Sequence, residues 1–383
     1  MFANFRTVER VLYGNGVAAR LGKEAFDLGA RKVALITDKG LVAAGIHLPL
    51  MASLEKAGIE ALLYDDTEKD PSPASIEKAA AWVKESGVDM LVGLGGGSAL
   101  DSTKATSVLA TNEAPMSRYF GLHKVPSPCL PTILVPTTAG TGSEMTSNAV
   151  LNDPETNSKM GTVSDYLYAR LVLLDPELTL GLPPFYTAIT GLDAIVHGIE
   201  SFVNLNATDF TDALNIRGLR MLVENIREAY ANGGNLRARE QMLYGAAMTG
   251  MAFSNTQNGI IHALGMSVSN ELHIPHGLMM AVCAPMGISF NALAAPQKFA
   301  TIAEILGSAP AGASVREKAR SAAAGFAALM DDLGIRQGLS HYGIKKSDLR
   351  AIAEKGAAYK RLMDGNPRKG TADDLERLLE EFF

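Results

Sequence analysis

Strand-length apolar runs alternate with segments of helical period through the first half of this chain and then cease. The runs at residues 32–37 and 89–94 are apolar at nearly every position, which is typical of strands buried on both faces of a sheet. The segments at residues 41–57 and 74–86 instead place apolar residues at helical spacing. This alternation predicts an α/β domain built on a doubly wound parallel sheet.

Strand signals end at Pro183 and Pro184, and the rest of the chain has helical period. The predicted helices cover residues 187–202, 208–231, 236–253, 256–268, 277–294, 297–306, 315–333, 346–358 and 372–382. A chain of 383 residues is too long for one hydrophobic core, which stops growing at about 250–300 residues. We therefore expect an α/β domain at residues 1–182 and an all-helical domain at residues 183–383.

Composition excludes several classes of protein. The net charge of −6 gives no basic surface for nucleic acid or for an anionic membrane. No apolar run approaches the ~18 residues that would cross a bilayer, and the N-terminal residues do not have the pattern of a signal peptide. Cys129 and Cys283 are the only cysteines, which indicates a reducing compartment. We expect a cytoplasmic enzyme with a small-molecule substrate.

A glycine-rich turn follows the fourth predicted strand. It contains Gly95, Gly96, Gly97 and Ser98, with Asp101 three residues further on. Glycines let the backbone approach a bulky anion, and Ser98 as N-cap would begin a helix whose free N–H groups can bind a phosphate. The turn is not the G-x-G-x-x-G fingerprint of the first strand, so its glycines could equally serve turn geometry alone.

Two further features would face the same cleft. Asp38 ends the second predicted strand, where a carboxylate can accept from a ribose hydroxyl and repel a 2′-phosphate, or can be a solvated turn residue. A loop after residues 132–135 is rich in hydroxyl groups, and it is either a second wall of the site or a plain surface loop. Its predicted cofactor contacts are Thr137, Thr138, Thr141 and Ser143. We add Lys159 and Leu178 to these predicted contacts.

One carboxylate and three imidazoles in the helical half form a candidate metal site. Asp193 and His197 are four residues apart, so a helix places them on one face. His262 lies in a predicted helix, and His276 follows a proline at a predicted helix start. Such a donor set suits Fe²⁺ or Zn²⁺, although spacing alone does not distinguish it from unrelated side chains.

Taken together, these motifs resemble those of the iron-dependent (group III) alcohol dehydrogenase family over essentially the whole chain. The matching segments are residues 95–98 with Asp101 and Lys104, residues 136–144, residues 191–193 with His197, residues 262–265, residues 274–277 and residues 366–368. The resemblance implies a dehydroquinate synthase-like architecture, with the cofactor bound to the first domain and the metal to the second.

The same resemblance implies roles for individual residues. Asp193, His197, His262 and His276 would bind the metal, the glycine turn would hold the pyrophosphate, and Asp38 would favour NAD over NADP. It also implies a homodimer, often formed by N-terminal strands.

The chain departs from this family at Met266. Members often carry a second histidine four residues after the third ligand, and that histidine is assigned to the proton relay. Methionine cannot carry a proton. We therefore expect His273 or water to take over the relay, or a relay that is built differently.

The predicted function is a reversible, NAD-linked and metal-dependent interconversion of a small alcohol and its aldehyde or ketone, with iron as the expected metal and zinc as a possibility. A maleylacetate-type reductase and a zinc polyol dehydrogenase of the same architecture remain alternatives. A more remote alternative is a dinucleotide-binding sensor without turnover, which only Met266 supports.

Overall fold

The structure is a computed structural model that describes residues 4–153, 158–272 and 274–383. The described residues form two compact units. One comprises the described residues between 6 and 182 together with 234–243, and the other comprises residues 4–5, 183–233 and the described residues between 244 and 383. Residues 234–243 thus group with the α/β unit, whereas we predicted them in the helical domain; the boundary after residue 182 stays a proposal. No helix in the described ranges is long and apolar enough to cross a membrane.

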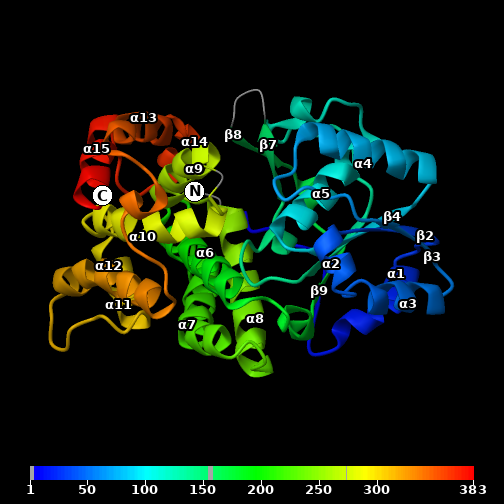
Figure 1. Cartoon of the computed structure of the whole chain (residues 1–383), viewed down its shortest axis with the longest axis horizontal. Coiled ribbons are helices and arrows are strands. Elements are labelled where there is room, and N and C mark those ends of the chain that lie inside the picture. Colours follow the sequence, from blue (N-terminus) through cyan, green and yellow to red (C-terminus); the bar gives the residue numbers. More distant parts are fainter. Residues whose placement is uncertain (1–3, 154–157, 273) are drawn as a thin grey trace. The chain divides into compact units, whose positions relative to one another are not determined.

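A fully parallel sheet forms the centre of the α/β unit (Figure 1). Within the described residues its strands are β1 (Val11–Tyr13), β2 (Lys32–Ile36), β3 (Glu60–Tyr64), β4 (Met90–Gly95), β6 (Thr132–Pro136) and β9 (Leu171–Leu174). Their spatial order is β1-β9-β6-β4-β2-β3. The strand order reverses between the neighbouring strands β2 and β4. At such a point a doubly wound sheet opens a crevice at the carboxyl ends of its strands. The predicted doubly wound parallel sheet is confirmed.

Helices cover both faces of this sheet, as Figure 1 shows. Alternate residues of β2 point to opposite faces: Val33 and Leu35 share an apolar cluster with α1 (Leu21–Asp27) and α3 (Leu48–Lys56), whereas Ala34 and Ile36 share one with α4 (Pro73–Ser86). Burial on both faces explains why β2 is apolar without alternation. The helix after β4 is α5 (Gly97–Thr111).

Two parts of the α/β unit differ from prediction. A small sheet of β5 (Gly121–Leu122), β8 (Ser158–Val163) and β7 (Asn148–Asp153) was not predicted. The predicted helix at residues 41–57 is two helices, α2 (Lys39–Ala43) and α3, because the chain turns at Gly45 with a φ of 72° that glycine adopts readily.

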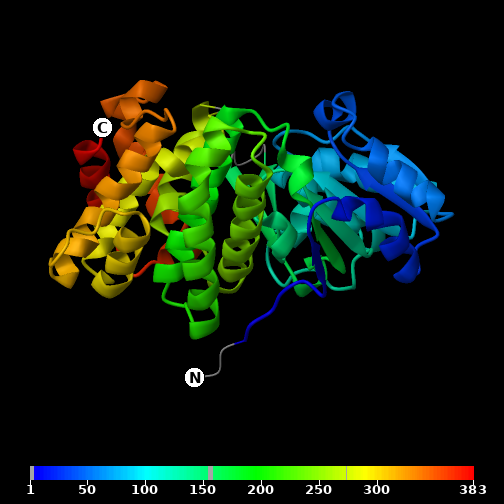
Figure 2. The same cartoon turned by 90° about the horizontal axis from the view of Figure 1, so that it is seen from below.

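The second unit is helical, as predicted, and Figure 2 shows its long helices side by side. Its helices are α6 (Pro184–Val203), α7 (Asp209–Ala231), the greater part of α8 (Leu236–Thr256), α9 (Ile260–Leu272), α10 (His276–Ala292), α11 (Pro296–Ile305), α12 (Val315–Asp332), α13 (Leu349–Ala358), α14 (Lys360–Gly365) and α15 (Ala372–Glu381). The α/β unit has short 3-10 helices at Val17–Arg20, Met116–Tyr119, Ser143–Met145, Asp165–Leu167 and Pro176–Thr179. The helical unit has two more, at Leu339–Tyr342 and Lys346–Asp348.

Helix α6 is the core of this unit. Nearly all of its residues are buried, and these include the polar residues Asp193, His197 and Glu200. A Cβ atom added at Gly198 would lie 2.8 Å from the side chains of Leu219 on α7 and Thr249 on α8, so glycine is what allows these helices to approach α6. A polar side chain on α6 is therefore held rigidly, and the predicted metal ligands Asp193 and His197 are on this helix.

Candidate functional site

The candidate metal centre begins with two buried residues of α6. Asp193 and His197 are 2% and 5% exposed, and Oδ1 of Asp193 lies 3.9 Å from Nε2 of His197. The four-residue spacing brings them to one face of the helix, as expected. The ring of His197 also stacks on Phe253 of α8, with ring centres 4.4 Å apart, which fixes its plane.

Helices α9 and α10 bring the other two imidazoles to the same carboxylate. Oδ1 of Asp193 lies 4.0 Å from Nε2 of His262 and 3.9 Å from Nε2 of His276. A Cβ atom at Gly277 would lie 2.5 Å from the carbonyl oxygen of Ile189, so glycine at this position lets α10 approach α6. The structure thus gathers all four predicted ligands around one carboxylate oxygen.

This arrangement fits a divalent metal. The ligand atoms of Asp193, His262 and His276 lie within 4.8 Å of one another. Two atoms bound to one ion at about 2.1 Å lie at most about 4.2 Å apart, a limit that each separation from Asp193 satisfies. Nε2 of His262 is buried and has no hydrogen-bond partner among the described residues, which is costly unless something else binds it.

Glu200 is part of this centre although the sequence analysis did not predict it. Its carboxylate is 2% exposed and lies 2.5 Å from Nδ1 of His262, while its other oxygen accepts from the N–H of Ile261 at 2.6 Å. Glu200 is seven residues after Asp193 and so on the same face of α6. That spacing was the available signal.

The glycine turn lies between β4 and α5. Gly95 has a φ of 149°, and a Cβ atom there would lie 2.7 Å from Ala99. A Cβ atom at Gly97 would lie 2.7 Å from the side chain of Thr141, and one at Gly96 would lie 3.4 Å from Thr138. Glycine is therefore favoured at position 95 by the backbone conformation of the turn and at position 97 by its close packing against the hydroxyl-rich loop. The two predicted walls of the cofactor site do lie together.

Ser98 does not cap this helix as we predicted. The N-cap is Gly96, and Ser98 lies within the first turn of α5 with its hydroxyl bonded to the carbonyl of Lys69. The N-cap position therefore carries no side-chain acceptor, which leaves the start of α5 suited to an anion.

Asp38 lies beside the glycine turn. Its Oδ1 accepts from the N–H of Leu41 at 3.0 Å and caps α2. Strands β2 and β4 are neighbours, and Oδ2 of Asp38 is directed toward Gly95. The carboxylate is half-buried at the carboxyl edge of the sheet, where the sequence analysis placed it.

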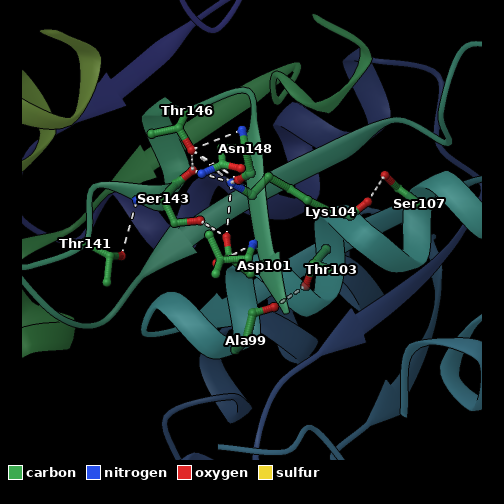
Figure 3. A network of polar contacts seen from close by, with 10 residues as sticks. Ala99, Asp101, Thr103, Lys104, Ser107, Thr141, Ser143, Thr146 and Asn148 are labelled. Carbon is green, nitrogen blue, oxygen red and sulfur yellow. Dashed lines mark hydrogen bonds and ion pairs between the residues drawn. The ribbon is translucent and has the colours of Figure 1, made fainter. Parts of the chain in front are cut away.

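Asp101 and Ser143 belong to an internal polar network around Lys104 (Figure 3). The ammonium of Lys104 is fully buried and lies 3.3 Å from Oδ1 of Asp101, 2.9 Å from the carbonyl of Ser143 and 3.1 Å from Oγ1 of Thr146. It also donates to the carbonyl of Asn148. Asp101 accepts from the Ser143 hydroxyl at 2.5 Å. These contacts fasten the hydroxyl-rich loop to α5.

Burial shifts two groups of this network in opposite directions. It lowers the pKa of Lys104, against the effect of Asp101, and raises the pKa of Glu144 to about 7. Glu144 is the neighbour of Ser143 and is 2% exposed.

The remaining predicted residues are dispersed. Thr137 is buried directly after β6. Lys159 pairs with Asp70 at 3.4 Å, and Leu178 packs against the apolar cluster beneath α1 and α3. Met266 is half-buried on α9, one turn after His262, and His273 lies outside the described residues.

Comparison with known proteins agrees with this geometry. Residues 8–176 match the model of the iron-containing alcohol dehydrogenase family, and residues 187–383 match that of the Fe-containing alcohol dehydrogenase family, C-terminal. The chain is 48% identical over 379 residues to a sulfoacetaldehyde reductase from Bilophila wadsworthia, with 98% of each chain covered. It is 35% identical over 377 residues to a 1,3-propanediol dehydrogenase from Klebsiella pneumoniae, with 97% and 96% covered.

Among solved structures, a 1,3-propanediol oxidoreductase superposes with a TM-score of 0.97 at 33% identity, and all of both chains is covered. This confirms the dehydroquinate synthase-like architecture. The chain therefore belongs to the iron-containing alcohol dehydrogenase family and is an alcohol dehydrogenase or aldehyde reductase of that type.

Proposed function

We propose that this enzyme transfers a hydride between nicotinamide and a small alcohol or aldehyde, with NAD as the cofactor and a divalent metal, iron or zinc, as the Lewis acid. The observation that carries the proposal is the buried carboxylate of Asp193 with three imidazoles at 3.9–4.0 Å. A buried cluster of this composition suits binding of Fe²⁺ or Zn²⁺.

Asp193, His197, His262 and His276 would hold the metal. When bound, such an ion polarises a substrate oxygen and stabilises alkoxide character as hydride is exchanged. Asp193 offsets part of the ionic charge, and α6 and Phe253 keep the ligands in place before substrate arrives. Burial of these side chains excludes water from all but the more exposed His276.

The dinucleotide would bind at the carboxyl edge of the parallel sheet. The start of α5 offers N–H groups to the pyrophosphate, and Asp38 would accept a hydrogen bond from an adenosine ribose hydroxyl. The same carboxylate would repel a 2′-phosphate, which supports NAD over NADP. Asp101 and Ser143 would act through the position of the loop rather than by contact, since their polar atoms are bonded to each other.

We propose short aldehydes as the substrate class. Sulfoacetaldehyde is the first to test, because the relative that is 48% identical over nearly the whole length is a sulfoacetaldehyde reductase. The 1,3-propanediol enzymes make short diols and hydroxyaldehydes the second class to test. A homodimer in the cytoplasm remains our proposal for its assembly and location.

The alternatives stay distinguishable. A maleylacetate-type reductase would not require the full ligand set, and a zinc polyol dehydrogenase would prefer zinc. A sensor would bind dinucleotide without turnover.

The test is NADH oxidation by metal-free protein reloaded with Fe²⁺ or Zn²⁺, measured with a panel of sulfoacetaldehyde, hydroxyaldehydes, simple aldehydes and maleylacetate. We expect turnover only with metal and only with aldehydes. Asp193→Asn keeps the shape of the side chain and should abolish both stoichiometric metal and turnover. Full activity of the metal-free enzyme, or of Asp193→Asn, would contradict the proposal.

A further inference from the structure

The helix that carries His262 begins with two contacts made by distant segments. The N–H of Ile260 donates to Oδ1 of Asn366 at 3.2 Å, and the N–H of Ile261 donates to Oε1 of Glu200 at 2.6 Å. These are the first two residues of α9, and His262 is the third. The free N–H groups of a helix start are usually satisfied by a neighbouring residue in sequence. Here side chains from α6 and from the segment after α14 satisfy them.

Glu200 uses both carboxylate oxygens at this point. While Oε1 accepts from Ile261, Oε2 lies 2.5 Å from Nδ1 of His262. A carboxylate accepts and an imidazole N–H donates, so this contact places the ring proton on Nδ1. Nε2 then keeps its lone pair, and it is the nitrogen that faces Asp193. One side chain thus fixes both the helix start and the tautomer.

Asn366, the acceptor for the N–H of Ile260, is itself held in place by further hydrogen bonds. Its amide is 1% exposed and exchanges two hydrogen bonds with Asn291 of α10, each at 2.8 Å, and it donates to the carbonyl of Arg368 at 2.7 Å. The guanidinium of Arg368 covers the ring of Phe290 at 4.0 Å and donates to its carbonyl. Asn366 therefore links α9, α10 and the C-terminal segment.

Gly259 makes room for this arrangement. A Cβ atom there would lie 2.7 Å from Oδ1 of Asn366 and 3.2 Å from Oε1 of Glu200. The three residues form one unit, in which a glycine admits two acceptors to the first turn of α9. A buried carboxylate is stabilised in this place by two donors and by the positive end of the helix dipole.

We propose that Glu200 and Asn366 are positioning residues of the metal centre: Glu200 sets the tautomer and orientation of His262, and Asn366 holds the helix start that carries it. The inference rests on the proposed metal function. It gives the C-terminal motif at residues 366–368 a role in the site, although this segment is more than 100 residues from His262 in sequence.

Glu200→Gln is the decisive variant, because it keeps the shape and removes one acceptor. The amide carbonyl can accept from Ile261 only if its NH₂ group faces Nδ1 of His262. A donating NH₂ group favours the tautomer in which Nδ1 accepts and the proton is on Nε2. Nε2 then has no lone pair with which to bind a metal. We expect long-range ¹H–¹⁵N spectra of the metal-free protein to report an Nδ1–H tautomer in the unchanged protein and an Nε2–H tautomer in Glu200→Gln. The signals of His262 are assigned by their loss in His262→Asn.

Metal affinity is the second readout. Mutation of a residue that hydrogen-bonds a metal-bound histidine typically lowers metal affinity by about 10–100-fold. We expect a loss of about that size in the affinity of Glu200→Gln for Fe²⁺ or Zn²⁺. Glu224→Gln, on the exposed face of α7, removes the same charge and should leave affinity unchanged. Asn366→Ala should weaken metal binding while His262 keeps its Nδ1–H tautomer.

The outcomes separate the two proposals. An unchanged tautomer together with unchanged metal affinity in Glu200→Gln would overturn the role of Glu200, and unchanged affinity in Asn366→Ala would overturn that of Asn366. A fall in thermal stability with neither change would show a merely structural role and would also overturn the inference. If the unchanged protein binds neither Fe²⁺ nor Zn²⁺, the proposed function fails, whereas the tautomer in the metal-free protein still tests Glu200.

Discussion

A Cβ atom placed on Gly95 would lie 3.9 Å from Oδ2 of Asp38, so the carboxylate at the end of β2 is an immediate neighbour of the glycine turn at the end of β4. Oδ1 of the same carboxylate is occupied as the cap of α2. Only Oδ2 is directed to the turn, and a phosphate bound there as part of NADP would meet a like charge.

Asp38→Asn should therefore raise the catalytic efficiency with NADP, since the amide oxygen can still cap α2 but the charge is gone. A desolvated like-charge contact costs several kcal/mol, so we expect a gain of at least tenfold, with a smaller change for NAD. Steady-state kinetics with both cofactors measures this. Asp65→Asn, a half-buried carboxylate just after β3, serves as the control. Equal efficiency of the unmodified enzyme with NAD and NADP would refute the assignment.

Lys104→Met should destabilise the α/β unit. The substitution keeps the length of the side chain but removes the donor from the carbonyl of Ser143, from Thr146 and from Asp101. Removing one partner of a buried ion pair costs about 3–5 kcal/mol. Because the loop then loses its attachment to α5, the dissociation constant of NAD should rise as well. Denaturant unfolding and cofactor titration measure the two effects.

Lys23→Met is the matched control, because it makes the same substitution in an exposed ion pair, that of Lys23 with Asp27 on α1. It should cost less than about 1 kcal/mol. If both variants lost a similar amount of unfolding free energy, the buried network around Lys104 would contribute no more to stability than an exposed ion pair.

Glu144 should make stability depend on pH. Burial raises its pKa from 4.5 to about 7 in the folded protein, with Lys104 opposing and Asp101 reinforcing the shift. The folded state then binds more protons than the unfolded state between these values, so stability falls as pH rises from about 4.5 to about 7. At 1.36 kcal/mol per pKa unit the loss is at most roughly 3 kcal/mol.

Glu144→Gln mimics the protonated carboxyl group and should flatten this part of the profile, becoming more stable than the unmodified protein above pH 7. Urea unfolding at pH 5, 6, 7 and 8 measures it, with Glu177→Gln as an exposed control. Parallel profiles for the two variants would rule out Glu144 as the source.

The cluster of one carboxylate and three imidazoles was predictable in part from the sequence, because two of its members have regular helical spacing. Helical periodicity predicted that Asp193 and His197 share one face of a helix. Their grouping with His262 and His276 was implied by the family resemblance, because spacing alone did not distinguish the set from unrelated side chains. Glu200 was missed although it lies on the same face of α6, because a glutamate on a helix is ordinarily solvated and only the tertiary contact with His262 gives it a role.

The errors in the α/β unit also have physical causes. Strands β7 and β8 carry no clear alternation, and their pairing with each other stabilises them rather than their local sequence. Ser98 has the composition of an N-cap, but the turn at Gly95 starts the helix two residues earlier than expected, and the hydroxyl bonds to the distant carbonyl of Lys69. Contacts between residues that are distant in sequence cannot be predicted from local sequence patterns.

Met266→His tests whether position 266 takes part in proton transfer. Met266 is half-buried and lies one turn after His262, so both side chains are on one face of α9. If proton release limits alcohol oxidation, an imidazole at this position should raise turnover, since general acid–base assistance is worth about 10²–10⁴-fold where it is limiting. It should also add a titration near neutral pH to the rate profile, because histidine changes charge there.

Met266→Leu is the matched control, because leucine keeps the apolar volume and carries no proton. The measurement is the pH–rate profile of alcohol oxidation for the three proteins. If hydride transfer or product release sets the rate, the histidine would alter the Michaelis constant or nothing, and its profile would coincide with that of the leucine variant. Coincident profiles would remove position 266 from the relay and leave proton transfer to solvent or to another part of the chain.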